Sequence, residues 1–189
     1  MALKTREKLI EVARQLFANK GVAHTTMNDI ANASSKGRRT VYTYFKNKVD
    51  IYNAVLESES DSIVSGLREI TEKEDSVENR LRLFLRFRLE HNTVHTSSSH
   101  KSWFKFDTKR FERVNRLVNA KENEMLGKLL NEGCQQGVFI QRRCTLLLGF
   151  INHCISRMDI PYPNEVDADF RERTINDFIE FIITDITDH

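Results

Sequence analysis

The scarcity of helix-breaking residues is the feature that most restricts what this chain can fold into. Its 189 residues include only two prolines and seven glycines, so few positions interrupt a helix. Apolar residues recur at helical spacing along nearly the whole chain. The clearest early face consists of Leu9, Val12, Ala13, Leu16 and Phe17. We therefore predict an all-α fold of about nine helices.

Capping residues predict several helix boundaries. Gly21 stands where the first helix would end. Thr26 and Asp29 have the spacing of a capping box, and Asn47 with Asp50 predicts the start of a long helix. Residues 80–89 alternate in part like a strand, but no partner strand or hairpin turn lies nearby, so a helix is favoured. Further helices are expected at about 109–136, 141–157 and 167–186, after a polar helix end and loop at 93–102.

Composition indicates a cytoplasmic protein. No apolar run approaches the ~18–20 residues that cross a bilayer, and the basic N-terminus lacks the apolar segment of a signal peptide. The three cysteines, Cys134, Cys144 and Cys154, suit neither a disulfide framework nor a usual zinc site. Small buried hydrophobes are the favoured interpretation, and a redox-sensing thiol is the alternative.

The charge is distributed unevenly along the chain. Of the 29 Lys and Arg residues, ten lie in residues 1–50, together with four of the 27 Asp and Glu residues. This segment therefore carries a net charge of +6 and the remainder −4. A basic head on a mildly acidic body is typical of a nucleic-acid reader with a separate second module, although charge also simply solvates helix faces. We predict a DNA-binding domain over residues 1–47 and a second domain over residues 48–189.

Residues 26–48, TMNDIANASSKGRRTVYTYFKNK, have the composition of a DNA-reading helix pair. A short helix is followed by a turn and a second helix that carries arginines, threonines and tyrosines. Arginine supplies bidentate donors for guanine edges, and Thr and Tyr hydroxyls reach phosphates. The segment predicts binding to double-stranded DNA.

The spacing between particular residues in and around this segment is specific. Gly21, the pair Thr25-Thr26 and the run Thr40-Val41-Tyr42-Thr43-Tyr44-Phe45-Lys46-Asn47-Lys48 fall at set distances from the apolar positions. From Arg6 to about Val55 the chain thereby resembles the TetR (tetracycline-repressor-like) family of transcriptional regulators. The resemblance implies a three-helix helix-turn-helix head that binds operator DNA as a two-fold dimer, usually to repress. It also implies a helical body over residues 48–189 that binds a small-molecule effector and dimerises through its last two helices.

The turn between the two short helices departs from the family's usual Ala-Gly-Val-Ser. Here it is Ser34-Ser35-Lys36-Gly37, followed by Arg38 and Arg39. These arginines are the main candidates for contact with base edges or phosphates. Thr26 is expected at a phosphate, and Lys48 likewise, while Val41 and Phe45 are expected to anchor the head core. The remaining candidate contacts are Thr40, Tyr42, Tyr44 and the weaker Lys46. For one of the two tyrosines, packing in the head core is the alternative.

Aromatic and adaptable side chains on the middle helices are candidates for an apolar effector pocket, with plain core packing as the alternative. They are Phe84, Phe87, His91, Trp103, Phe104, Phe106, Phe111, Met125 and Leu129. His91 and His95 stand one helical turn apart, so a metal site must be weighed, but the sequence offers no evident third ligand. No metal and no cofactor is expected.

Each of the last two helices has an apolar stripe, and the stripe on the second is too broad for a helix with only one buried side. On the first, Leu146, Leu147, Phe150, Ile151 and Ile155 are apolar; on the second, Phe170, Ile175, Phe178, Ile179, Ile182, Ile183 and Ile186. Such a helix usually packs against both its own domain and a partner, which predicts a homodimer, with an extra core helix in a monomer as the alternative. Ile179→Glu is expected to split this dimer.

The sequence favours a ligand-responsive repressor. An architectural or cell-cycle DNA-binding protein without an effector is the alternative, and a closed apolar cavity in the body would distinguish the two. An enzyme is disfavoured because the sequence has no nucleophile elbow, Gly-rich phosphate loop or convincing pair of carboxylates.

Overall fold

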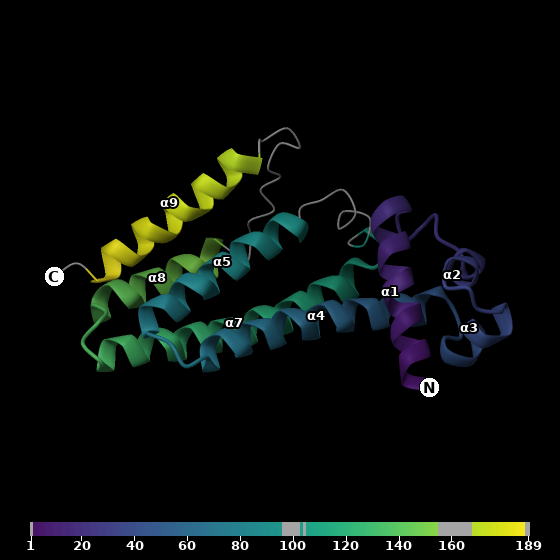
Figure 1. The fold of residues 1–189 in the computed structure, drawn as a ribbon, viewed down its shortest axis with the longest axis horizontal. Helices are drawn as coiled ribbons and strands as arrows, with labels where there is room; N and C mark the ends of the chain where they lie inside the picture. The colour runs from purple at the N-terminus through teal and green to yellow at the C-terminus, as the bar shows by residue number, and fades with distance from the viewer. Residues whose placement is uncertain (1, 96–102, 104, 155–167, 188–189) are drawn as a thin grey trace. The chain divides into compact units, whose positions relative to one another are not determined.

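The computed structural model describes residues 2–95, 103, 105–154 and 168–187, and helices dominate that part of the chain (Figure 1). The helices are α1 (Ala2–Lys20), α2 (Met27–Ala33), α3 (Arg38–Tyr44), α4 (Lys48–Glu72), α5 (Val77–His95), α7 (Thr108–Gln135), α8 (Gln141–Cys154) and α9 (Ala168–Thr187). The predicted all-α fold is confirmed, and the expected number of about nine helices is close to these eight. The stretch 80–89 lies inside α5, which confirms the helix predicted there.

The chain divides into two compact units. The first comprises Met1–Ser62 and Ser97–Arg116, and the second comprises Ile63–Thr96 and Leu117–His189. Because α4 runs from Lys48 to Glu72, it supplies residues to both units. The compact units therefore differ from the domains expected at 1–47 and 48–189, and that functional boundary stays a prediction.

The predicted helix caps are present. The Thr26 hydroxyl accepts a hydrogen bond from the Asp29 backbone N–H (3.1 Å), and the Asp29 carboxylate accepts one from the Thr26 N–H (2.7 Å). The Asn47 side-chain oxygen accepts one from the Asp50 N–H (2.9 Å) just before α4. Gly21 ends α1 with φ +82°, a conformation that glycine adopts without steric penalty.

The first unit has its own core. Leu9, Phe17, Ile30 and Val41 are completely buried in it. Tyr52 of α4 is also completely buried, and its hydroxyl donates a 2.9 Å hydrogen bond to the Trp103 carbonyl oxygen. Burial raises the pKa of the Tyr52 phenol, which moves its deprotonation still further above neutral pH.

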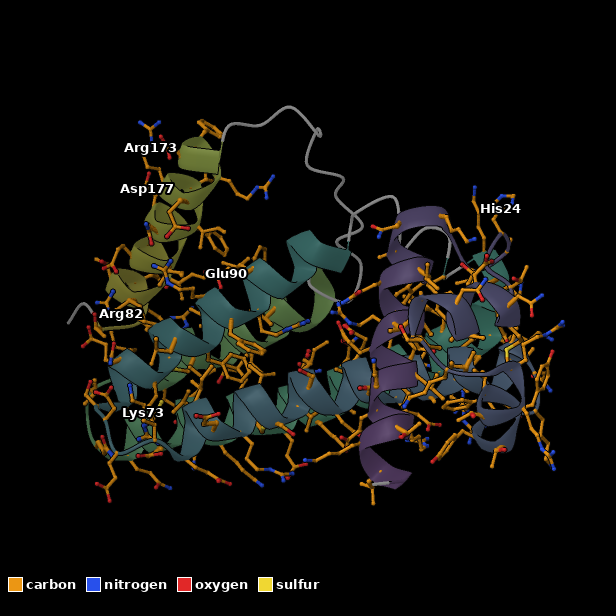
Figure 2. The ribbon with its side chains drawn as sticks, turned by 45° about the vertical axis from the view of Figure 1, so that its right-hand side comes forward. His24, Lys73, Arg82, Glu90, Arg173 and Asp177 are labelled. Carbon is orange, nitrogen blue, oxygen red and sulfur yellow. The ribbon has the colours of Figure 1, made fainter. Side chains whose placement is uncertain are left out.

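The second unit packs α5, α7, α8, α9 and the later part of α4 around a second core. On the surface, ion pairs join α5 to α9: Arg82 pairs with Glu180, and Arg86 pairs with Glu172 at 2.7 Å. Figure 2 shows Arg173 extending from the side of α9 that faces away from α5. The α9 helix thus presents one side to its own unit and another to the surroundings.

A tight turn connects α7 to α8. A side chain at Gly133 would place its Cβ 2.0 Å from Cδ2 of the Phe139 ring, so only glycine lets this buried ring pack against α7. Nearby, Cys144 is buried as predicted and Cys134 is half-buried. Burial and a hydrogen bond with Cys134 raise the pKa of the Cys144 thiol to about 12, which keeps it protonated and unreactive at neutral pH. The side chain of Cys154 lies outside the described residues.

Among the described residues, no helix combines the length and the apolar character needed to span a bilayer.

Candidate nucleic-acid interface

The start of α2 is held by a small network. Lys20 of α1 forms a 2.8 Å ion pair with Asp29. Asp29 also accepts a hydrogen bond from the Thr26 hydroxyl (2.8 Å). The Thr26 side chain is therefore engaged as a helix cap, and its predicted contact with a phosphate remains a prediction.

This network predicts a pH-dependent stability. Hydrogen bonds from Lys20 first, and then from Thr26, lower the pKa of the Asp29 carboxyl from 3.8 to about 2. Because the folded pKa is below the unfolded one, the stabilisation is complete above pH 3.8 and is lost as the pH falls towards 2. We expect Asp29→Asn to melt at a lower temperature than wild type at neutral pH. The two melting temperatures should converge below pH 3.8 in a series of thermal melts; a constant difference would contradict this.

The turn between α2 and α3 keeps its length with unusual residues. Ser35 has φ +55°, a left-handed conformation that favours glycine. Ser34 is completely buried, and its hydroxyl donates a 3.1 Å hydrogen bond to the Ala31 carbonyl oxygen. Gly37 is the N-cap of α3 and makes no side-chain cap. Compared with Ala-Gly-Val-Ser, the glycine has moved from the second position, where the backbone is left-handed, to the cap.

The α3 helix presents one face to the head core and another to solvent. Val41 is completely buried and Phe45 is 4% exposed, so both anchor the helix as predicted. The opposite face carries Arg38, Arg39 and Tyr42, all exposed. Neither guanidinium forms an ion pair or hydrogen bond with any residue that the structure describes. Two cations thus remain available at the start of an anchored helix.

The remaining candidate DNA contacts differ in how exposed their side chains are and in whether they already have partners. Lys46 is exposed, Thr40 is half-buried, and Tyr44 packs partly against the head core, as its alternative interpretation allowed. The Lys48 ammonium donates a 3.0 Å hydrogen bond to the Ala23 carbonyl oxygen and lies 5.3 Å from the centre of the Phe106 ring. The stronger of the two lysine candidates therefore already has partners within the first unit.

The candidate pocket residues do not form one cluster. Trp103, Phe106 and Phe111 pack against the core of the first unit, where Phe106 stacks edge-to-face on Tyr52. Phe84, Phe87, Met125 and Leu129 belong to the second unit. The side chains of His91, His95 and Phe104 lie outside the described residues. Ligand binding by any of these residues remains a prediction.

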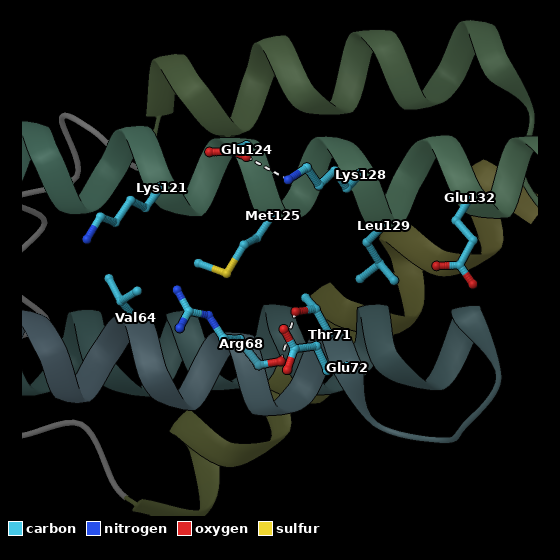
Figure 3. Close-up of a pocket in the computed structure, with 10 residues that line it drawn as sticks. All are labelled: Val64, Arg68, Thr71, Glu72, Lys121, Glu124, Met125, Lys128, Leu129 and Glu132. Atoms are coloured by element: carbon cyan, nitrogen blue, oxygen red, sulfur yellow. Dashed lines mark hydrogen bonds and ion pairs between the residues drawn. The ribbon is translucent and has the colours of Figure 1, made fainter.

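Two of the candidates line a cleft within the second unit. Met125 and Leu129 of α7 face the later part of α4 across a space of about 390 Å³ (Figure 3). The rest of the lining is mostly charged: Arg68, Glu72, Lys121, Glu124, Lys128 and Glu132, with Val64 and Thr71. Such a lining differs from the predominantly apolar walls of most small-molecule pockets.

A buried ion pair in the second unit was not anticipated from the sequence. Arg88 Nη2 of α5 lies 2.9 Å from Glu122 Oε2 of α7, and the two side chains are only 7% and 6% exposed. Helical periodicity gave a signal for it, because Arg88 continues the buried face of Leu81 and Leu85 at the next turn.

Known proteins match this chain most clearly in the head. The family model described as bacterial regulatory proteins of the tetR family matches residues 9–55. A probable acrEF/envCD operon repressor of Escherichia coli strain K12 is 50% identical over 52 residues, which cover 28% of this chain and 24% of the repressor. The transcriptional regulator TtgR of Pseudomonas putida is 36% identical over 77 residues, or 41% of this chain and 36% of TtgR. The matched region thus spans about a quarter to a third of these relatives.

Solved structures extend the likeness of fold to the whole chain. A transcriptional regulator from Cytophaga hutchinsonii has a TM-score of 0.71 at 19% identity, covering 96% of this chain and 97% of that one. The fatty acid degradation regulator FadR from Bacillus halodurans has a TM-score of 0.65 at 17% identity, covering 95% and 94%. Residues 9–55 thus match the TetR family of bacterial regulatory proteins in sequence, and the chain as a whole matches transcriptional regulators in fold.

Proposed function

We propose that this protein is a DNA-binding transcriptional repressor that a small-molecule effector releases from its operator. The main supporting observation is the exposed pair Arg38 and Arg39, which lack partners among the described residues and stand at the start of a helix anchored by Val41 and Phe45. A recognition helix places its N-terminal residues against base edges in the major groove. The E. coli relative, named as a probable operon repressor, supports the same function.

Selection from a random pool of DNA duplexes tests this proposal. We expect enrichment of a palindromic site, because a two-fold dimer reads two half-sites. A salt titration of the enriched duplex should show a steep loss of affinity, as expected when several phosphates are contacted. Equal binding to every duplex would instead favour an architectural DNA-binding protein.

The proposed dimer uses α8 and α9. On α8, Leu147 and Ile151 turn towards the unit's own core, whereas Leu146 and Phe150 are 66% and 55% exposed. On α9 the isoleucines are buried, and three aromatic rings are exposed: Phe170, Phe178 and Phe181. Ile155 lies outside the described residues. Exposed aromatic side chains on adjacent helices support a partner surface.

The structure changes the variant that should test this dimer. Ile179 is 3% exposed in its own unit, so a glutamate there would disrupt the core in addition to any dimer. Phe181 is 70% exposed, and we expect Phe181→Glu to yield a folded monomer by light scattering. Leu117→Glu, at an apolar residue of α7 that is 60% exposed, should leave the dimer mass unchanged. A Phe181→Glu protein with the mass of the wild-type dimer would contradict the assigned surface.

A further inference from the structure

The Arg88–Glu122 pair is a polar centre in an otherwise apolar core. On α5, Phe84 and Leu85 precede Arg88 by one turn and are 2% and 3% exposed; on α7, Leu126 follows Glu122 by one turn and is 1% exposed. Residues three or four apart share a helix face, so both charges lie within the cluster that these side chains form. An apolar enclosure with few fixed polar groups is the usual environment of a small-molecule site.

One atom of this centre lacks a hydrogen bond. Glu122 Oε2 contacts Arg88, but the other carboxylate oxygen, Oε1, is buried and accepts no hydrogen bond from any described residue. An unsatisfied buried acceptor is unfavourable because it has lost its water without gaining a donor. Replacing such a pair by apolar residues is often neutral or stabilising, so stability alone gives little reason for the pair.

We propose that Glu122, held in place by Arg88, anchors an effector with an apolar body and one N–H donor group, such as a lipophilic amine. The missing partner of Oε1 is a donor, so an amine complements it and a carboxylate does not. This inference rests on the proposed function, in which the body binds a small effector. It identifies the chemical class of that effector and the side chain that recognises it.

Four probes that share a phenylbutyl body test the proposal on the full-length protein: phenylbutylamine, phenylbutanol, phenylbutyl methyl ether and phenylbutyrate. Isothermal titration should show the amine binding about tenfold or more tightly than the ether, since a hydrogen bond to a charged group contributes at least that factor. The alcohol should lie between them, and the carboxylate should bind most weakly. Equal affinities, tightest binding of phenylbutyrate, or no binding of any probe would each overturn the proposal.

Variants test which residues cause the preference for the amine over the ether. In Arg88→Met/Glu122→Leu the preference for the amine over the ether should disappear, with folding checked by circular dichroism. Glu122→Gln retains one acceptor oxygen without the charge, so the amine should lose affinity relative to the alcohol; an unchanged ratio would contradict the anchor even if the double variant does not fold. The matched variant Lys128→Met/Glu124→Leu removes an exposed α7 pair at the cleft and should preserve the preference for the amine over the ether. If this variant loses that preference, the probes bind in the cleft. Failure of the wild type to select any operator would count against the proposed function and not against the anchor.

Discussion

Glu122→Leu should lower the free energy of unfolding by about 3–5 kcal/mol, because it leaves the Arg88 guanidinium buried without its counterion. Arg88→Met should have a similar effect by leaving the Glu122 carboxylate unpaired. The double variant should lie within about 1 kcal/mol of wild type or be more stable, since it removes both buried charges together. Urea denaturation of the four proteins gives the coupling energy directly.

The exposed pair of Lys128 and Glu124 provides the comparison for this cycle. Their side chains are 74% and 64% exposed, and a solvated pair of this kind contributes at most about 1 kcal/mol. We expect a coupling energy for Arg88 and Glu122 that is several times larger. Single variants at Arg88 and Glu122 that lose no more stability than those at the exposed pair would show that the buried charges are solvated in solution.

Arg38→Ala or Arg39→Ala should weaken binding to the selected operator by about 1–3 kcal/mol if the replaced arginine reads a base. The loss should then be concentrated at one position of the half-site, and a panel of duplexes with single base changes would reveal it. Lys128→Ala, in the second unit, serves as a control for the general effect of removing a positive charge. An equal loss on all duplexes, with a smaller salt slope, would identify the residue as a phosphate contact.

Local chemistry allowed much of the head to be predicted. The Thr26–Asp29 box and the Asn47 cap depend on residues three apart, so sequence spacing alone specifies them. Val41 and Phe45 were correctly expected to be buried because helical periodicity places them on one side of α3.

The candidate pocket depends on contacts between distant segments, which spacing does not specify. Trp103 and Phe106 are aromatic like Phe84, yet they pack beside Tyr52 in the first unit, whereas Phe84 belongs to the second. Tertiary pairing decides between these cores, and no local signal distinguishes their aromatic rings. The buried position of Arg88 was likewise not predicted, because arginine is almost never fully buried unless it is paired and the sequence does not reveal its partner.

The contact between Gly133 and Phe139 has a consequence for how this protein tolerates change. In a library that samples every amino acid at each position, position 133 should be depleted of all replacements, alanine included, because even one methyl group would overlap the Phe139 ring. Gly149 of α8, by contrast, has no atom within 4 Å of where a Cβ would stand, and should accept small side chains within a single protomer. Two glycines in adjacent helices would thus differ sharply in mutational tolerance. If glycine is enriched at position 149 only in cells that require repression, the restriction at that position comes from assembly of the protein and not from folding of the protomer.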